Sequence, residues 1–131
     1  MRSGEATEEV LFVADFRNLR VWRAAQDLAI DVHNVTRAMR GSRSATLSDQ
    51  MIRAAMSVPS NIVEGNAHAS PREFARFLSY ALASAWEVEG HLQLARDLGM
   101  MTEADFDRLV ARDIDVRKML YGLLKSLKAK S

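Results

Sequence analysis

Apolar residues recur at alternating spacings of three and four along most of the chain, which is the pattern of a helix with one buried face. The first such stretch covers about residues 19–39, and Asn18 is placed to cap its first turn. Its apolar seam consists of Trp22, Ala25, Ala29, Val32, Thr36 and Met39. A break follows at residues 41–44. Thr46, with Asp49 three residues later, then predicts the start of a second helix.

The second predicted helix contains a proline within residues 50–65. Pro59 lacks the N–H that would bond the Ala55 carbonyl, a defect that costs roughly 3 kcal/mol in a helix interior. Asn61 is placed to serve that carbonyl with its side chain. At 100° per residue, one face of this helix is apolar and the opposite face is a polar stripe, formed by Gln50, Arg53, Ser57, Asn61 and Glu64.

Two interpretations of this polar stripe stand side by side. It is either a solvated outer face or a hydrogen-bonded network at a contact between protomers. Glu64 lies near a helix C-terminus, where the helix dipole disfavours a carboxylate, so in the second interpretation a cation from another helix or subunit anchors it. Trp86 packs either inside the bundle or onto a neighbouring subunit. The candidate oligomer or structural network is therefore Gln50, Arg53, Ser57, Pro59, Asn61, Glu64 and Trp86.

Clear start and stop signals delimit the third predicted helix. Ser70 caps it, Pro71 suits its first position and Glu73 completes a capping box. The helix extends to about Leu98, and Gly99 is a natural stop. We expect its inward stripe to be Phe74, Phe77, Leu78, Ala81, Ala85, Val88 and Leu92.

Thr102 is expected to cap a fourth helix, whose apolar lining consists of Phe106, Val110, Ile114, Leu120, Leu124 and Leu127. Short connections make consecutive helices antiparallel. The sequence thus predicts an all-α fold, an antiparallel up-down-up-down four-helix bundle over residues 16–131. Residues 1–15 are small and acidic, and we expect them to form a flexible N-terminal arm.

Composition narrows the possible functions. The chain has 131 residues and no cysteine, which excludes disulfides, zinc–thiolate sites and thiol catalysis and fits the cytoplasm. Eighteen basic and seventeen acidic residues nearly cancel, so bulk charge predicts neither a membrane nor a nucleic-acid partner. No stretch approaches the ~20 apolar residues that a membrane span needs, so we expect no membrane contact.

Basic residues gather in three places, and only one of them lacks a structural explanation. Cations near helix C-termini are stabilised by the helix dipole, which accounts for Arg37 and Arg40 and for the group Lys118, Lys125 and Lys128. A third group lies at a helix N-terminus, where the dipole opposes it. This group, Arg17, Arg20 and Arg23, is the better candidate for contact with a polyanion such as RNA or DNA. The full candidate nucleic-acid-binding set is Arg17, Arg20, Arg23, Arg37, Arg40, Lys118, Lys125 and Lys128.

Candidate catalytic sets are sparse. Glu87 and His91 lie four residues apart on one helical face, but a di-iron bundle needs Glu-x-x-His pairs on two helices and further carboxylates. The chain has no glycine-rich phosphate loop and no nucleophile-elbow serine. We therefore expect no enzyme activity, no cofactor and no metal.

Four segments together resemble one family, the 23S rRNA intervening-sequence proteins, whose relatives include the accessory variability determinant of diversity-generating retroelements. The segments are residues 16–22, 50–65, 73–84 with Glu87 and Glu89, and 119–128. The resemblance implies a bacterial four-helix bundle that assembles as a ring, commonly a homopentamer. It implies no activity. The retroelement relatives are partners of a reverse transcriptase and bind nucleic acid through basic surface.

Two hypotheses follow from the residues and the resemblance. In the first, the chain is a non-enzymatic homo-oligomer, a pentamer, that binds nucleic acid or a nucleic-acid-processing partner such as a reverse transcriptase. In the second, it is a purely structural oligomer or protein-interaction adaptor with no role in nucleic-acid binding. Salt-dependent binding of RNA or DNA separates the two.

Overall fold

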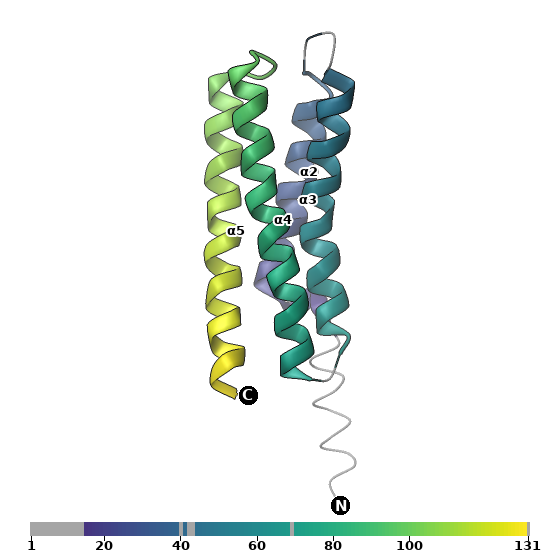
Figure 1. Cartoon of the computed structure of the whole chain (residues 1–131), viewed down its shortest axis with the longest axis vertical. Helices are drawn as coiled ribbons and strands as arrows, with labels where there is room; N and C mark the ends of the chain where they lie inside the picture. Colours follow the sequence, from purple (N-terminus) through teal and green to yellow (C-terminus); the bar gives the residue numbers. More distant parts are fainter. Residues whose placement is uncertain (1–14, 40, 42–43, 69, 131) are drawn as a thin grey trace, which may run out of the picture.

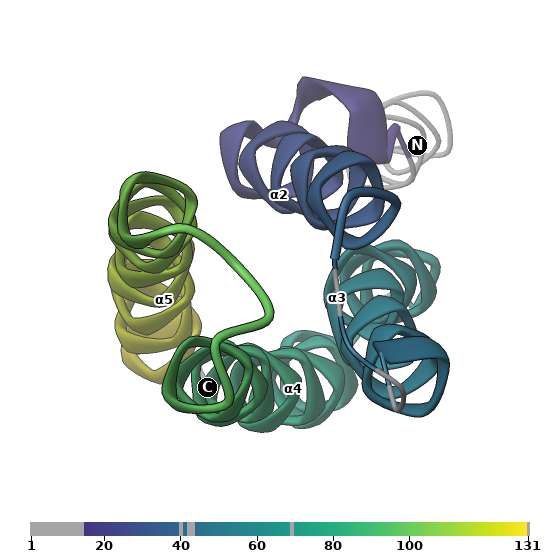
Figure 2. The same cartoon turned by 90° about the horizontal axis from the view of Figure 1, so that it is seen from above.

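The computed structural model describes residues 15–39, 41, 44–68 and 70–130. Within them the chain forms four long antiparallel α-helices after a short 3-10 helix (Figure 1). The elements are η1 (Phe16–Asn18), α2 (Arg20–Thr36), α3 (Ser44–Asn66), α4 (Pro71–Asp97) and α5 (Glu103–Lys130). Viewed end-on, the helices follow one another around the bundle in chain order, so α2 packs against both α3 and α5 (Figure 2). The predicted all-α four-helix bundle is confirmed. The arm predicted at residues 1–15 lies outside the described residues except for Asp15.

The first two helices begin where the sequence did not place them. Asn18 belongs to η1, whose first turn is capped by the Asp15 carboxylate, and Leu19 stands at the start of α2 without a side-chain cap. The predicted Asn18 cap is therefore wrong. α3 begins at Ser44, whose N–H bonds the Gly41 carbonyl at 3.2 Å. Thr46 consequently lies inside α3 and is not its cap.

The predicted Ser70 and Thr102 caps and the Gly99 stop are confirmed, while the Glu73 carboxylate of the predicted capping box accepts from the Arg76 guanidinium. The Ser70 hydroxyl accepts from the Glu73 N–H at 3.3 Å, and the Thr102 hydroxyl accepts from the Asp105 N–H at 3.1 Å. Gly99 adopts a φ of 71°, the left-handed conformation that ends a helix without strain when the residue is glycine. These caps satisfy N–H groups that the first turn of a helix cannot bond internally.

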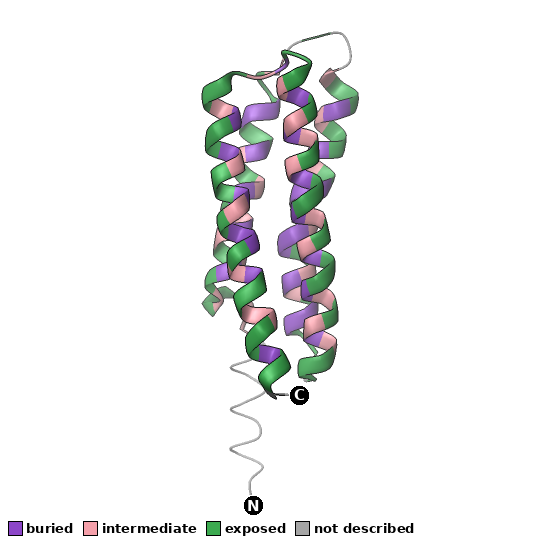
Figure 3. Ribbon diagram, turned by 60° about the vertical axis from the view of Figure 1, so that its left-hand side comes forward, coloured by how far each residue is buried: buried purple, intermediate pink, exposed green. Residues whose placement is uncertain are grey.

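Buried residues, mostly small or aliphatic, recur along each helix (Figure 3) and together form the core of the bundle. The side chains with the least exposure include Leu28 and Val32 on α2, Met51, Val58 and Ile62 on α3, Leu78 and Leu92 on α4, and Leu109, Val116 and Leu120 on α5. Every member of the stripe predicted for α4 is buried except Phe77, which is half-buried.

The stripes predicted for α2 and α5 are rotated from the observed ones. On α2, Trp22 and Ala29 are only half-buried, and Leu28 takes the central position. On α5, the observed core face includes a charged residue, Asp113, next to half-buried Ile114. A search for apolar residues alone cannot find such a face, which is why the predicted register differs.

The close approach of α3 and α4 depends on Gly65. A Cβ atom added at this buried position would lie 2.7 Å from the Cβ of Phe77 and 2.9 Å from Cδ1 of Phe74. Contacts this short do not occur between real side chains, so a larger residue would push the two helices apart. The last turn of α3 therefore packs directly on the first turns of α4.

We expect Gly65→Ala to destabilise the fold by about 1–3 kcal/mol, the usual cost of overpacking a close helix contact. Gly122→Ala is the matched control, because a Cβ there meets nothing within 4 Å. Removing that glycine from a helix interior should stabilise the protein by about 0.5–1 kcal/mol. Urea unfolding followed by circular dichroism measures both. Equal effects of the two variants would contradict the close approach.

Candidate functional site

The arrangement of the helices brings two of the three basic groups to the same end of the bundle. Arg17, Arg20 and Arg23 are exposed around the beginning of α2, and Lys125 and Lys128 are exposed in the last two turns of α5. α2 and α5 are antiparallel neighbours, so the beginning of one lies at the same end as the end of the other (Figure 1). We call these five residues the basic end. Lys118, also exposed, lies further along α5, toward the middle of the bundle.

The arginines of the basic end differ in their local contacts. The Nε atom of Arg17 lies 3.0 Å from a carboxylate oxygen of Asp15, which partly neutralises it. The guanidinium of Arg23 lies 4.8 Å from the centre of the Trp22 ring. None of the ion pairs among the described residues involves Arg20. Cations in this setting gain nothing from the helix dipole, so fold stability does not explain their presence.

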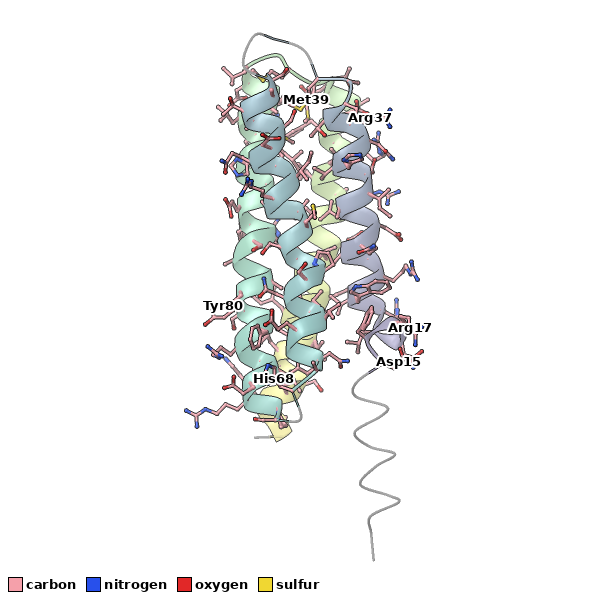
Figure 4. The ribbon with its side chains drawn as sticks, turned by 90° about the vertical axis from the view of Figure 1, so that its right-hand side faces the viewer. Asp15, Arg17, Arg37, Met39, His68 and Tyr80 are labelled. Atoms are coloured by element: carbon pink, nitrogen blue, oxygen red, sulfur yellow. The ribbon has the colours of Figure 1, made fainter. Side chains whose placement is uncertain are left out.

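The third basic group does not join the basic end. Arg37 is exposed at the opposite end of α2 from Arg17 (Figure 4). Arg40, predicted with it, lies outside the described residues. A ligand at the basic end would therefore not touch Arg37 unless it also followed the length of the bundle.

The polar stripe of α3 divides into an inner and an outer part. Ser57 and Asn61 are half-buried, and the Ser57 hydroxyl lies 2.8 Å from the hydroxyl of Ser84 on α4. Gln50, Arg53 and Glu64 are exposed. The middle of the stripe thus serves a contact within the chain, between α3 and α4. Its ends face outward.

The predicted role of Asn61 at the proline is wrong. Its side-chain amide donates to the Ser57 carbonyl at 2.9 Å and to the Ser57 hydroxyl at 3.1 Å, and not to the Ala55 carbonyl that Pro59 leaves without its usual partner. One helical turn separates Asn61 from Ser57, so the amide reaches back to the carbonyl directly beneath it. α3 continues through Pro59, which is buried.

A buried ionic cluster between α4 and α5 escaped the sequence analysis. Arg117, 6% exposed, places Nη2 2.6 Å from a carboxylate oxygen of Glu89 and Nε 3.4 Å from one of Asp113. Asp113 is fully buried, and neither of its carboxylate oxygens has a hydrogen-bond partner among the described residues. Burial raises the pKa of Asp113 to about 7; the charge of Arg117 opposes this rise and that of Glu89 adds to it.

The signal for this cluster was present in the sequence. Asp113 and Arg117 are four residues apart, on the same helical face as Leu109, Val116 and Leu120. A charged pair at that spacing inside an apolar stripe indicates a buried ion pair, which then needs a further partner from the facing helix. Glu89 on α4 supplies it.

Trp86 covers this cluster on its outer side. The Arg117 guanidinium lies 3.7 Å from the centre of the Trp86 ring, and the indole N–H donates to the Tyr121 hydroxyl at 3.3 Å. Trp86 nevertheless remains 54% exposed. Two contacts therefore fix the orientation of the ring while about half of its surface faces solvent.

The outer face of α4 continues as an apolar ridge. Leu94, two turns after Trp86, is 47% exposed, and Leu98 lies one turn further on and is also exposed. Gly90, between Trp86 and Leu94, has open space around its missing side chain. We call Trp86, Gly90, Leu94 and Leu98 the α4 ridge. A glycine costs helix stability, and here no contact among the described residues requires one.

A second apolar surface lies between α2 and α3. It is a groove of about 660 Å³ with Phe16, Trp22, Gln26, Ala29, Ile30, His33, Ile52, Met56, Pro59, Ser60, Val63 and Glu64 along it. None of the ion pairs found in the described parts of the chain includes Glu64, the only carboxylate of the groove. We call this the α2–α3 groove.

The described residues offer little for metal chemistry. Nε2 of His91 lies 3.3 Å from a carboxylate oxygen of Glu87, so the predicted pair does meet on α4. No three histidine, aspartate or glutamate side chains gather into a possible metal site anywhere in the described ranges. Within those same ranges, no helix has both the length and the apolar character needed to cross a bilayer.

The fold and its surfaces define the class of protein: an antiparallel four-helix bundle with a basic end, an apolar ridge and an apolar groove. The chain belongs to the family described as 23S rRNA-intervening sequence protein, whose model matches residues 17–122. Among solved structures it is similar to a protein with unknown function from the S23 ribosomal protein family of Bacteroides thetaiotaomicron. The two chains share 23% identity with a TM-score of 0.74, and the match covers 80% of this chain and 98% of the other. A comparison with curated proteins finds no match.

The raised pKa of Asp113 predicts a pH-dependent penalty on stability. Between its ordinary value of 3.8 and its folded value of about 7, the folded state binds more protons than the unfolded state. Stability from this group therefore falls as pH rises through that range and is lowest above it. The Asp113→Asn variant lacks this titrating group. We therefore expect its free energy of unfolding, minus that of the wild type, to increase by about 1–3 kcal/mol from pH 4 to pH 8.

Urea unfolding at a series of pH values measures this difference. Asp115→Asn is the matched control, because Asp115 is an exposed carboxylate on the same helix. Its stability relative to the wild type should hardly change over the range. A flat difference for Asp113→Asn as well would show that Asp113 titrates normally.

Proposed function

We propose that this protein is a non-enzymatic homo-oligomer that binds nucleic acid through the basic end of each bundle. The observation that supports this most is that α2 and α5 are antiparallel neighbours, so that Arg17, Arg20 and Arg23 lie at the same end of the bundle as Lys125 and Lys128. Phosphate contacts supply most of the affinity in sequence-independent binding. Exposed cations at one end of the bundle, three of which the helix dipole does not favour, are suited to that task.

Assembly would make a weak basic site effective. A single bundle offers only a few phosphate contacts, while the net charge of the chain is +1. In a ring, every subunit repeats the basic end around the axis, and linked weak contacts gain affinity through effective concentration. We take the ring to be the pentamer that the family resemblance implies. A nucleic-acid-processing protein such as a reverse transcriptase is the protein partner that fits the same surface.

The α4 ridge is the surface best suited to a subunit contact. Trp86 is held by Arg117 and Tyr121, so ordering it at an interface would cost little side-chain entropy. The open space at Gly90 would let a neighbouring backbone approach closely.

The basic end is tested by the binding of fluorescently labelled single-stranded RNA, measured by anisotropy at several salt concentrations. We expect the logarithm of the affinity to fall linearly with the logarithm of salt concentration. The triple variant R17A/R20A/R23A should lower the magnitude of this slope by about two, because each lost phosphate contact removes roughly 0.7 for single strands.

The control triple variant, R53A/R108A/R112A, removes three exposed arginines from the first halves of α3 and α5, toward the end of the bundle opposite the basic end (Figure 1). Its total charge equals that of R17A/R20A/R23A, so general electrostatic attraction is the same in both. We expect it to retain most of the wild-type slope. Equal losses in the two variants would assign binding to net charge alone. Absence of binding at low salt would favour the structural oligomer.

The α4 ridge is tested by Leu94→Glu, with the mass measured by light scattering. We expect the wild type to have a multiple of the 14.7 kDa chain mass and the variant to be a monomer with unchanged helical circular dichroism. Met56→Glu is the matched control, since Met56 is 57% exposed in the α2–α3 groove. A Leu94→Glu protein that keeps the wild-type mass would exclude the ridge as the contact.

A further inference from the structure

Four side chains around the beginning of α4 form a surface of stacked rings beside a cation. His68, which follows the end of α3, stacks on the Phe77 ring with a centroid distance of 5.2 Å and 9° between the ring planes. Tyr80 meets Phe77 edge-on at 5.7 Å. The Arg76 guanidinium lies 5.0 Å from the centre of the Phe77 ring and 5.7 Å from that of Tyr80. We call His68, Arg76, Phe77 and Tyr80 the aromatic platform.

Contacts with both helices hold the aromatic platform in place. Gly65 lets the last turn of α3 pack directly on the first turns of α4, and its carbonyl accepts from the His68 N–H at 3.2 Å. Arg76 donates through Nη1 to the Tyr80 hydroxyl at 3.2 Å and through Nη2 to a Glu73 carboxylate oxygen at 3.0 Å. A ligand would meet side chains that are already ordered, which lowers the entropy cost of binding.

One side of the stacked rings is open to a ligand. Half-buried Phe77 covers one face of His68, whereas His68 itself is exposed and Tyr80 is 46% exposed. Within the described ranges, no second ring stacks on His68. The ring face that is turned away from Phe77 can therefore stack with a flat aromatic ligand.

Positive charge beside the platform favours a ligand that also carries an anion. Arg72 is exposed one turn before Arg76, on the same face of α4. No ion pair in the described parts of the chain involves Arg72. It lies in the first turn of α4, where the helix dipole disfavours a cation. A stacking surface next to an uncompensated arginine matches a nucleobase with its phosphate.

The aromatic platform lies at the same end of the bundle as the basic end. The helices alternate in direction, so α4 begins where α2 begins, and Figure 4 shows His68 and Arg17 toward the same end. A nucleic-acid strand at the basic end is thus brought to the end that carries the platform. In a duplex the faces of the bases are covered by neighbouring bases, so only an unpaired base can stack on a side chain.

We propose that the aromatic platform binds an unpaired nucleobase of single-stranded RNA or DNA, which stacks on the open face of His68 while a neighbouring phosphate contacts Arg72. This inference rests on the nucleic-acid binding proposed above. It adds a part of the affinity that depends on the base, whereas the basic end supplies the part that depends on phosphate and salt.

His68→Ala tests the stack, and His33→Ala, which removes an exposed histidine near the opposite end of the bundle, is the matched control. Binding of labelled single-stranded RNA at low salt is measured by anisotropy. We expect His68→Ala to lower the affinity by roughly 5- to 150-fold, the effect of losing one base–aromatic stack, and His33→Ala to leave it unchanged. Arg72→Ala should lower the magnitude of the salt slope by about 0.7.

The outcomes separate this inference from the proposed function. Equal affinities of wild type and His68→Ala would overturn the stack and leave binding at the basic end intact. Absence of binding by the wild type at low salt would overturn both. The same measurements with single-stranded DNA distinguish the two ligands, because a fall in affinity for either strand supports the stack and identifies the strand it takes.

A second measurement needs no change to the protein. An abasic strand of the same length keeps the phosphates and lacks the bases. The wild type should bind the base-bearing strand at least about fivefold more tightly than the abasic one, because only the former can stack. In His68→Ala this preference should shrink. Equal wild-type affinities for the two strands would overturn the proposal.

Discussion

The packing of α4 on α5 depends on the charge of Arg117. This guanidinium is almost entirely buried, so it needs partners that can replace water. Glu89 comes from the facing helix at 2.6 Å, Asp113 from one turn earlier on α5, and Trp86 covers the outer side. Any sliding of α4 along α5 would separate these groups and leave a buried charge without compensation. The cluster therefore fixes the register of the two helices and, through it, the position of Trp86 on the surface.

The remaining surface is what the packing of the four helices leaves exposed. One stripe of each helix is buried in the core, and the absence of a side chain at Gly65 lets α3 pack closely on α4. Three features remain that the fold itself does not need: the basic end, the α4 ridge and the α2–α3 groove. Each costs stability or solubility in a lone bundle. We propose that contacts outside the bundle core, with nucleic acid and with other copies of the chain, use these surfaces.

The sequence predicted most of the fold because helical periodicity and capping are local. The Ser70 and Thr102 caps, the stop at Gly99 and the number and direction of the helices were all predictable from short stretches. The start of α2 could not be predicted in this way, because Asn18, the expected cap, belongs to η1. The Asp113–Arg117 pair was missed because the predicted stripe of α5 was built from apolar residues alone, and its partner Glu89 could be identified only with α4 in place. That two basic groups lie at the same end of the bundle could be known only from the topology of α2 and α5, and the groove could be known only with α2 and α3 placed side by side.

The central claim is that copies of this bundle assemble and present the basic end to nucleic acid. Sedimentation velocity of the wild-type chain mixed with labelled single-stranded RNA tests both parts in one experiment. The account predicts a protein boundary heavier than the 14.7 kDa monomer, with RNA moving in it at low salt and separating from it at high salt. A boundary at the monomer mass at every concentration, with RNA sedimenting alone even at low salt, would contradict it.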